Sequence, residues 1–379
     1  MTNSLALYIH IPFCTQKCSY CAFTSFAPQT KQIENYFNAL LKEVQLASNN
    51  YKNKKVDTIF IGGGTPSYVK SGFIAKLVNL IKLNYKVTKE CEITIEANPE
   101  SINKEKLQEY KKVGINRLSI GCQTTNKKLL KLLNRAHSKK QFLHAVKLAK
   151  QQGFNNINAD LIIGLPTQKL KHVKKDVKKL TKLGLTHLSV YDLILEENTP
   201  FSNKVKSGKL QPLSEKLTLK MQDYVVKKLN KRKYMRYEVS AYSKKGYKSA
   251  HNLKYWQGKD YLGLGLSSHS KISDTRFFNT SNLNTYINNV TNNGELKYEN
   301  KHILTKKEKQ EEYIMLGLRK TEGINIKEYN KLFKKDLLND KQKKIEMLLI
   351  KGLIKFRNDQ LQLTNKGFNV LNNIILQLI

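Results

Sequence analysis

The first 240 residues alternate short runs of β-branched residues with longer amphipathic stretches, and this alternation constrains the fold more than any other feature of the chain. It is typical of β-α units whose strands lie parallel in one sheet. We expect six strands, over residues 7–11, 57–61, 92–97, 117–121, 156–163 and 187–193. The stretches between them carry apolar residues at helical spacing, as in 32–47, 72–83, 104–113 and 139–151. The pattern predicts an α/β fold, either a partial (β/α)6 barrel or an open sheet.

The length and the apolar content agree with a globular protein of more than one domain. The chain has 379 residues, of which 40% are hydrophobic, enough to bury a full core and too many for a disordered chain. Its longest apolar runs, such as 5–11, are far shorter than the roughly 20 residues of a transmembrane helix. The N-terminus lacks the features of an export signal. We therefore expect a cytoplasmic protein without a transmembrane segment.

The net charge of +37 allows two interpretations. Lysine and arginine could neutralise the phosphates of a nucleic acid. Alternatively, the charge reflects a compositional bias, because only seven residues are arginine and the lysines are scattered over the whole chain. We favour the second interpretation and expect no specific nucleic-acid partner.

Three of the five cysteines form a compact motif. Cys14, Cys18 and Cys21 are spaced as C-x3-C-x2-C directly after the first expected strand. A structural zinc site requires four ligands, and the sequence offers no fourth ligand nearby. Three thiolates on a 4Fe-4S cluster would leave one iron open to a substrate or cofactor. We favour the cluster, although three cysteines without a metal remain the alternative; Cys91 and Cys122 are expected in the core.

Glycines and polar residues follow the other expected strands. In β-α folds ligands bind at the C-terminal ends of the strands, so these positions test the cysteine hypothesis. The second strand ends in a triple glycine, 62–64, where backbone groups can approach a ligand closely. Glu96 ends the third strand, Gln123 follows the fourth, and Asp160 lies on the fifth. The glycines could simply form a tight turn, and Glu96 and Asp160 could simply be solvated. We favour a binding site, because all these residues lie at the same edge of the expected sheet as the cysteine loop.

These motifs resemble those of the radical S-adenosylmethionine (SAM) superfamily. The similarity covers about residues 5–270 and includes YIHIPFC, GGGTPS, RLSIGCQ, DLIIGLP and HLSVYDL, which resemble the branch that holds oxygen-independent coproporphyrinogen III dehydrogenases and HemW-type haem chaperones. The resemblance implies that the three clustered cysteines ligate a 4Fe-4S cluster whose fourth iron binds SAM. It implies that this SAM is held by a first set of residues: Tyr8, Gly63, Gly64, Thr65 and Glu96. A second set would bind another SAM molecule: Tyr20, Gln123, Arg135 and Asp160.

Two positions separate the members of this branch. The dehydrogenases have another cysteine two residues after the third ligand, where this chain has Phe23. The segment from His251 to Tyr255 contains the H-N-x-x-Y pattern associated with the chaperones, and Trp256 follows it. The resemblance thus implies that His251 binds haem iron and that Tyr255 packs against the macrocycle. We expect a haem chaperone that delivers haem to an acceptor haemoprotein, without assigned catalytic residues; the dehydrogenase is the alternative, and a homodimer is left open.

The β-α rhythm stops at about residue 300. The sequence then predicts helices over 306–319, 326–332, 340–351 and 365–378, and a hairpin over 353–363. Helices followed by a two-stranded wing predict a small winged-helix-like α+β domain, which resembles the C-terminal domain of the same branch. We divide the chain into a barrel (1–240), a connecting segment with the H-N-x-x-Y motif (241–300) and this C-terminal domain (301–379).

Overall fold

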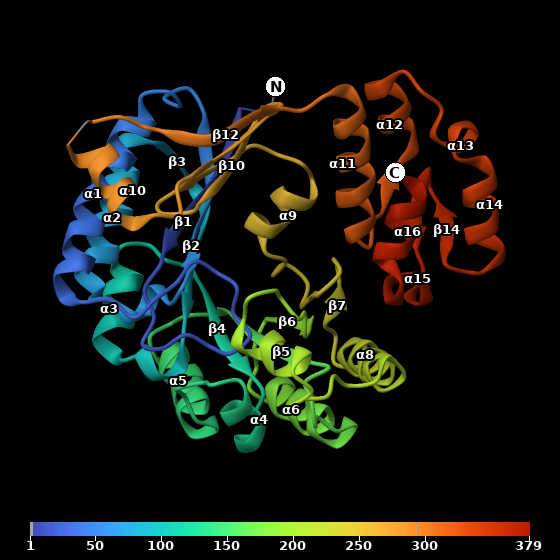
Figure 1. Cartoon of the computed structure of the whole chain (residues 1–379), viewed down its shortest axis with the longest axis horizontal. Helices are drawn as coiled ribbons and strands as arrows, with labels where there is room; N and C mark the ends of the chain where they lie inside the picture. The colour runs from blue at the N-terminus through green and yellow to red at the C-terminus, as the bar shows by residue number, and fades with distance from the viewer. Residues whose placement is uncertain (1–2, 293) are drawn as a thin grey trace.

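A mixed sheet forms the centre of the larger part of the molecule (Figure 1). The computed structural model describes residues 3–292 and 294–379. Six parallel strands follow one another in chain order: β1 (Ser4–Ile11), β2 (Lys55–Gly63), β3 (Lys86–Ala97), β4 (Arg117–Gln123), β5 (Asn156–Ile163) and β6 (His187–Asp192). All six expected strands are present, and the partial (β/α)6 barrel is confirmed.

Helices cover the outer face of this sheet (Figure 1). Those whose buried residues share the main core with the strands are α1 (Thr30–Ser48), α2 (Ser71–Asn84), α3 (Lys104–Lys112), α5 (Lys139–Gln151), α6 (Leu170–Lys182) and α8 (Glu215–Asn230). Four shorter helices lie in the segments that follow the strands: η1 (Pro66–Tyr68), η2 (Pro99–Ser101), α4 (Lys127–Leu132) and α7 (Pro200–Lys206). The helix predicted over 139–151 has the same bounds in the structure, because Ser138 caps it and its apolar residues face the sheet. Cys91 and Cys122 are buried in the core, as expected.

Residues beyond 234 extend the sheet at both edges. On the β6 side lie β8 (Ala241–Ser243) and β7 (Met235–Arg236), and on the β1 side lie β9 (Tyr261–Leu264), β10 (His269–Ile272), β11 (Thr275–Asn279) and β12 (Tyr298–Ile303). The last three strands of the β1 side run antiparallel to their neighbours. The same part of the chain forms α9 (Ala250–Trp256) and α10 (Leu283–Thr291). The sheet remains open, with β12 at one edge and β7 at the other.

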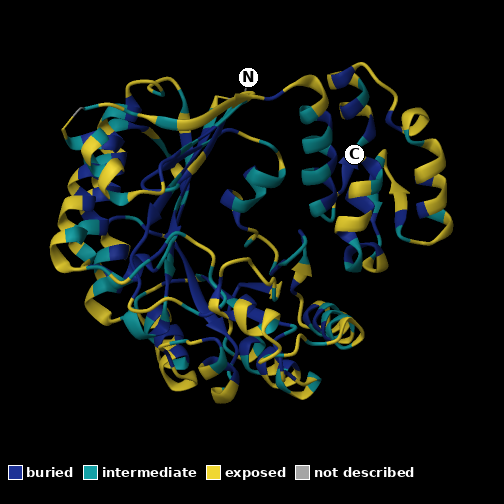
Figure 2. Cartoon of the chain, in the orientation of Figure 1, coloured by how far each residue is buried: buried dark blue, intermediate teal, exposed yellow. Residues whose placement is uncertain are grey.

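The strand register gives the inner face of the barrel a polar row. Glu96 on β3 lies beside Ser119 on β4, which lies beside Asn158 on β5, which lies beside His187 on β6. Side chains of a strand alternate between the two faces of the sheet, so these four share one face. Their intervening neighbours are apolar and pack under the helices, where Figure 2 shows the buried layer. The fold thus directs its polar side chains into the barrel.

The C-terminal domain has its own small sheet and core. Its elements are α11 (Lys306–Arg319), β13 (Ile324–Asn325), α12 (Ile326–Phe333), α13 (Leu337–Asp340), α14 (Gln342–Ile350), β14 (Ile354–Arg357), β15 (Gln360–Leu363), α15 (Asn365–Asn369) and α16 (Leu371–Leu378). The expected small α+β domain is confirmed. The helix predicted over 365–378 is wrong in one respect, because Val370 leaves the helical conformation and divides it.

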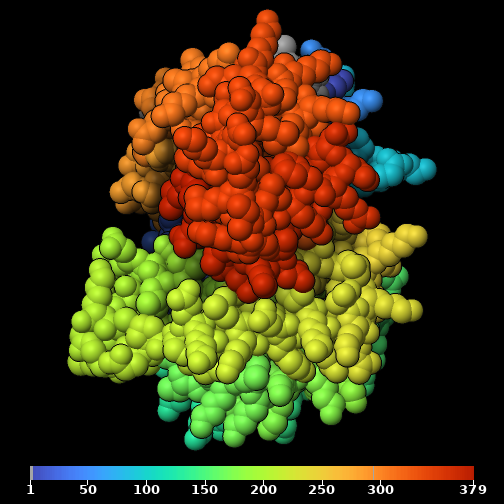
Figure 3. Space-filling view, turned by 90° about the vertical axis from the view of Figure 1, so that its right-hand side faces the viewer, coloured from blue at the N-terminus to red at the C-terminus, as the bar shows by residue number. Residues whose placement is uncertain are grey.

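The C-terminal domain packs on the side of the barrel where α9 lies (Figure 1), and in Figure 3 this domain, in red, faces the viewer. The guanidinium of Arg319 on α11 lies 5.8 Å from the centre of the Trp256 ring at the end of α9. A second contact places Arg236 of β7 over the ring of Phe368, 4.1 Å from its centre. Within the described residues, no helix combines the length and apolar character required to cross a membrane.

Candidate functional site

The three clustered cysteines lie on the loop that follows β1. Cys14 is buried, and Cys18 and Cys21 are half-buried. The backbone holds this loop in place, since Cys14 N–H donates to the Phe26 carbonyl at 3.0 Å and Cys21 N–H donates to the Cys18 carbonyl at 3.2 Å. Burial raises the pKa of the Cys14 and Cys21 thiols, and the charge of neighbouring cysteines raises it further.

The three thiols of this loop do not converge on a single point. Among residues 3–292 and 294–379, no three His, Cys, Asp or Glu side chains are grouped in a way that could hold a metal ion. In a 4Fe-4S cluster each thiolate binds a different iron, so the three sulfurs need not converge on one point. Three half-buried or buried thiols on one short loop are the donor set that such a cluster requires.

The glycine turn after β2 is pressed against the cysteine loop. A Cβ atom on Gly64 would lie 2.8 Å from the Phe13 carbonyl oxygen and 3.0 Å from the Cys14 sulfur, and a Cβ on Gly62 would lie 2.9 Å from a carboxylate oxygen of Glu96. Gly63 has φ +111°, a conformation that other residues rarely adopt. Only glycines allow the turn, the loop and Glu96 to approach this closely.

Two carboxyl groups face the interior of the barrel beyond this turn. Glu96 accepts a hydrogen bond from Gly63 N–H at 3.2 Å, and burial together with the nearby charge of Asp160 raises the pKa of Glu96 to about 8. Asp160 accepts hydrogen bonds from Asn158 Nδ2 at 2.8 Å and from Ser119 Oγ at 3.3 Å, while burial raises its pKa. A cation placed between two such carboxyls would favour their ionised form and lower both pKa values.

Tyr8 connects this site to the cysteine loop. Its hydroxyl lies 3.1 Å from His10 Nδ1, and His10 Nε2 lies 2.8 Å from the carbonyl oxygen of Thr24. Burial and the charge of Glu96 raise the pKa of Tyr8. Both β1 side chains point to the same face as Glu96, so the structure brings together the first set of predicted cofactor residues: Tyr8, Gly63, Gly64, Thr65 and Glu96.

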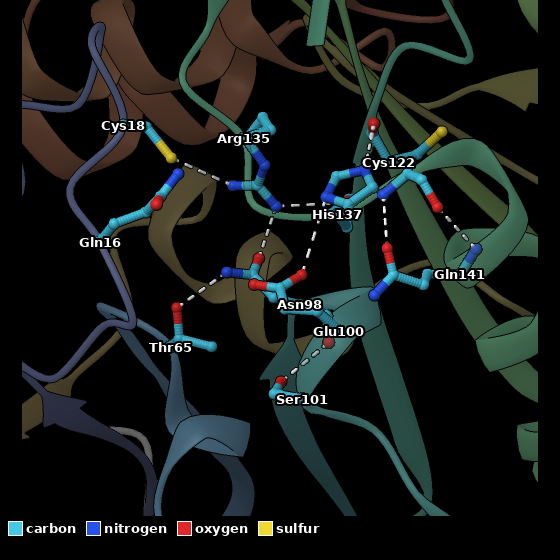
Figure 4. Close-up of polar contacts among 12 residues, drawn as sticks. Gln16, Cys18, Thr65, Asn98, Glu100, Ser101, Cys122, Arg135, His137 and Gln141 are labelled. Carbon is cyan, nitrogen blue, oxygen red and sulfur yellow. Dashed lines mark hydrogen bonds and ion pairs between the residues drawn. The ribbon is translucent and has the colours of Figure 1, made fainter. Parts of the chain in front are cut away.

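Arg135 is the centre of the second predicted set. Its Nη1 donates to the Cys18 sulfur at 3.4 Å, and its Nη2 donates to Asn98 Oδ1 at 2.6 Å and to the Gly121 carbonyl at 3.3 Å (Figure 4). The electrostatic influence of Arg135 on Tyr20 opposes the burial that raises the tyrosine's pKa. Gln123, buried at the end of β4 with φ +59°, completes the group.

Asn98, which directly follows β3, was not among the residues expected in the site. A polar residue at the C-terminal end of a parallel strand is the signal that could have identified it. Asn98 N–H donates to Ser67 Oγ at 3.1 Å, and this contact fixes its position beside the glycine turn.

His251 and Tyr255 lie on α9, apart from the cysteine loop. The Glu92 side chain of β3 accepts hydrogen bonds from the backbone of Ala250 and His251, at 3.1 and 3.0 Å, and so anchors the start of the helix on the inner face of the sheet. The His251 ring is fully buried, and its Nδ1 lies 3.0 Å from Thr58 Oγ1. Burial lowers the pKa of His251 to about 3, so the imidazole is neutral.

Known proteins resemble this chain along almost its whole length. Residues 8–180 match the radical SAM superfamily, and residues 304–370 match the HemN C-terminal domain. The heme chaperone HemW of Bacillus subtilis is 35% identical over 361 residues, which cover 95% of each protein. HemW of Lactococcus lactis is 34% identical over 97% of this chain and 95% of its own.

The solved structure of the coproporphyrinogen III oxidase HemN from Escherichia coli, a radical SAM enzyme, has the same fold. The two structures superpose with a TM-score of 0.86 over all of this chain and 90% of the enzyme, at 24% identity. HemW of E. coli is 36% identical over 73% of each chain. The sequence identity to these chaperones, with the cysteine loop and glycine turn of the barrel, shows that the chain belongs to the HemW haem-chaperone family within the radical SAM superfamily.

Proposed function

We propose that this protein is a haem chaperone that binds a 4Fe-4S cluster, SAM and haem, and transfers haem to an acceptor haemoprotein. The observation that carries the proposal is the juxtaposition of three thiols, a glycine turn and two inward carboxyls at one end of the barrel, with a buried histidine on the same inner face. The chaperones of B. subtilis and L. lactis, which align over nearly the whole chain, support the haem assignment.

Cys14, Cys18 and Cys21 would each bind one iron of the cluster. When bound, the cluster supplies one-electron transfer and an open coordination position at its fourth iron. The backbone of Gly64 lies against the Cys14 sulfur, since an added Cβ there would come within 3.0 Å of it, so the glycine turn would border the cluster.

Glu96 and the backbone of the glycine turn would hold SAM. The sulfonium of SAM is a fixed cation, and a buried carboxylate stabilises a cation strongly once both have lost water. Tyr8 supplies a hydroxyl on the same side, and Thr65 lies next to the turn. We propose that a second SAM molecule is held by four further residues, of which Arg135 donates to the Cys18 sulfur: Tyr20, Gln123, Arg135 and Asp160.

His251 would bind the haem iron, and Tyr255 and Trp256 would contact the macrocycle. In the arrangement described, His251 Nε2 lies 2.9 Å from the Tyr255 hydroxyl, and the ring has no exposed surface. Iron ligation therefore requires α9 to shift away from β2 and β3 and Tyr255 to release the imidazole. The neutral imidazole is the form that binds iron, so no proton needs to leave His251.

The dehydrogenase alternative has less support. Phe23, which takes the place of the additional cysteine of the dehydrogenases, is 68% exposed and offers no thiol. The likeness to HemN extends to the fold, whereas the chains of higher identity are heme chaperones. We place the protein in the cytoplasm, because its five cysteines are free and thiols remain reduced in that compartment.

Haem titration tests the proposal. The full-length protein is reconstituted with iron and sulfide under anaerobic conditions, titrated with haem and followed at the Soret band, then mixed with an apo-haemoprotein and separated by gel filtration. We expect saturable binding and transfer of haem to the acceptor. Absence of binding would refute the chaperone function, and formation of protoporphyrinogen and deoxyadenosine from SAM and coproporphyrinogen would favour the dehydrogenase.

A further inference from the structure

Asn98 connects two hydrogen-bond paths that end on different cysteines of the predicted cluster. Its Nδ2 donates to Thr65 Oγ1 at 3.0 Å, and the Thr65 hydroxyl donates to the Cys14 sulfur at 3.4 Å. Its Oδ1 accepts from Arg135 Nη2 at 2.6 Å, and Arg135 Nη1 donates to the Cys18 sulfur at 3.4 Å. Figure 4 shows Thr65, Asn98, Arg135 and Cys18 in this order along the path.

The chemistry of the partners fixes the direction of every hydrogen bond in the path. Arginine can only donate, so the amide oxygen of Asn98 must face Arg135. The amide nitrogen then faces Thr65 and donates to its hydroxyl oxygen. The hydroxyl proton of Thr65 is consequently free to point at the Cys14 sulfur. One asparagine orientation therefore presents a hydrogen-bond donor to each of two sulfurs, and the opposite orientation would disrupt both contacts.

The backbone holds Asn98 in a single position. Its N–H donates to Ser67 Oγ at 3.1 Å, and its carbonyl accepts from the Ser101 hydroxyl at 2.8 Å and from Ser101 N–H at 3.0 Å. Pro99 follows and begins the short helix η2. The side chain thus starts from a rigid point between the end of β3 and the glycine turn. Thr65 is buried, with 2% of its surface exposed, so its hydrogen bonds act in a medium of low dielectric.

Hydrogen bonds to the sulfurs of an iron–sulfur cluster raise its reduction potential. The reduced cluster carries one more negative charge than the oxidised cluster, so a donor at the sulfur stabilises the reduced form more. The positive charge of Arg135 acts in the same direction and at the same sulfur. Loss of Asn98 would free the Thr65 hydroxyl to turn away from Cys14, and would remove the shorter of the two hydrogen bonds that Arg135 Nη2 donates.

We propose that Asn98 is a positioning residue that raises the reduction potential of the cluster by holding Thr65 and Arg135 against Cys14 and Cys18. The inference rests on the proposed cluster, and it gives a role to Asn98, which belongs to neither of the two cofactor-binding sets. It also gives Arg135 a role at the cluster itself, in addition to the proposed contact with SAM.

The midpoint potential of the reconstituted full-length protein tests the inference. An anaerobic redox titration followed by electron paramagnetic resonance of the reduced cluster gives this potential. We expect Asn98→Ala to shift the potential to a more negative value while the iron content stays that of the unmodified protein. Asn98→Ser, which is smaller but still polar, should shift it in the same direction and serves as the second variant if the alanine variant loses its cluster.

Asn103→Ala is the matched control. Asn103 lies five residues further on the same segment, and its exposed side chain caps α3 by accepting from Lys106 N–H at 2.9 Å, far from the cysteines in sequence. Its loss should cost about 1 kcal/mol of stability and leave the potential unchanged. In a Thr65→Val and Arg135→Lys background, Asn98→Ala should produce little further shift, because the donors through which it acts are already altered.

Two results would overturn the inference. An unchanged potential in both Asn98 variants with full iron content would show that the path does not affect the cluster, and an equal shift in Asn103→Ala would show a nonspecific structural effect. A protein that binds haem normally but fails this test keeps its proposed function. Failure of the unmodified protein to take up any cluster would overturn the cluster assignment together with this inference.

Discussion

The Tyr255 hydroxyl lies 2.9 Å from Nε2 of His251, one helical turn away on α9, while Thr58 Oγ1 lies 3.0 Å from the Nδ1 atom of the same ring. Both nitrogens of the imidazole are thus engaged inside the barrel. A histidine in this position is protected from solvent and from iron until α9 moves. The relationship suggests that Tyr255 controls access to the proposed haem ligand.

Haem binding should respond in opposite ways to changes at the two residues. His251→Ala should weaken haem binding at least tenfold, because the iron loses its nitrogen ligand. Tyr255→Phe keeps the aromatic ring but removes the hydroxyl, so the hydrogen bond to His251 no longer has to be broken before haem binds. That hydrogen bond contributes about 1 kcal/mol, and its loss should make haem binding several-fold tighter or faster. Soret titration and stopped-flow mixing measure both effects. Equal haem affinity of His251→Ala and the unmodified protein would contradict the ligand assignment.

SAM affinity should rise with pH up to about pH 8. Burial and Asp160 raise the pKa of Glu96 to about 8, so the carboxyl is protonated below this value and ionised above it. A cationic ligand binds the ionised form, and its affinity should therefore increase by up to about tenfold per pH unit between pH 6 and 8 and then level off. Calorimetric titration of the reconstituted protein between pH 6 and 9 measures this profile.

Two variants identify the group responsible for the profile. Glu96→Gln cannot ionise and should bind SAM weakly at every pH. Asp160→Asn removes the negative charge that contributes to the raised pKa of Glu96, so the increase in affinity should occur at lower pH. If the unmodified protein gives a flat profile, Glu96 does not bind the cation.

Gly64→Ala should prevent cluster incorporation. The added Cβ would lie 2.8 Å from the backbone oxygen of Phe13 and 3.0 Å from the Cys14 sulfur, and a backbone atom cannot move aside as a flexible side chain can. Gly72→Ala in the first turn of α2 is the matched control, because a Cβ there meets nothing within 4 Å. The control should retain its cluster and gain a few tenths of a kcal/mol or more in stability. Iron analysis and thermal unfolding distinguish the two, and normal iron content in Gly64→Ala would contradict the close packing.

The sequence predicts the parallel strands well because hydrophobic periodicity and the polar residues at strand ends are local signals. The strand predicted over 156–163 is β5 itself, and the cysteine loop and glycine turn lie where the C-terminal ends of the strands meet. The strands β9 to β12 were not predicted, since they are short and depend on pairing rather than on their own pattern: β9 pairs with β1, and β10, β11 and β12 each pair with the strand before them.

The position of α9 also depends on contacts that are distant in sequence. The H-N-x-x-Y motif identifies His251, but the contacts that bury it come from Thr58 and Glu92, more than 150 residues earlier. The contacts of Asn98 also come from residues that are distant in sequence. The sequence places it at the end of β3, and only the fold brings Arg135 and Thr65 to its two amide atoms.

Glu43 on α1 provides a final test of how the barrel supports the cysteine loop. Its buried carboxyl accepts hydrogen bonds from Tyr286 at 2.6 Å, Asn279 at 2.7 Å and Gly265 N–H at 2.7 Å. The segment after Gly265 reaches the cysteine loop, because Ser267 Oγ accepts a hydrogen bond from Thr24 at 3.1 Å. Glu43 thus links α1 and α10 to the segment that contacts the cysteine loop.

Glu43→Gln should destabilise the protein, because the glutamine N–H group would face one of these three donors. A buried donor without an acceptor costs about 1–3 kcal/mol, and at about 2–4 °C per kcal/mol the melting temperature should fall by several degrees. Glu34→Gln on the exposed face of the same helix is the control and should leave the melting temperature unchanged. Thermal unfolding by circular dichroism measures both. Equal melting temperatures of the two variants would show that the Glu43 carboxyl is not the acceptor that holds α1, α10 and Gly265 together. If only Glu43→Gln has a lowered melting temperature, its reconstituted cluster should also be lost at a lower temperature, because the cysteine loop loses its support.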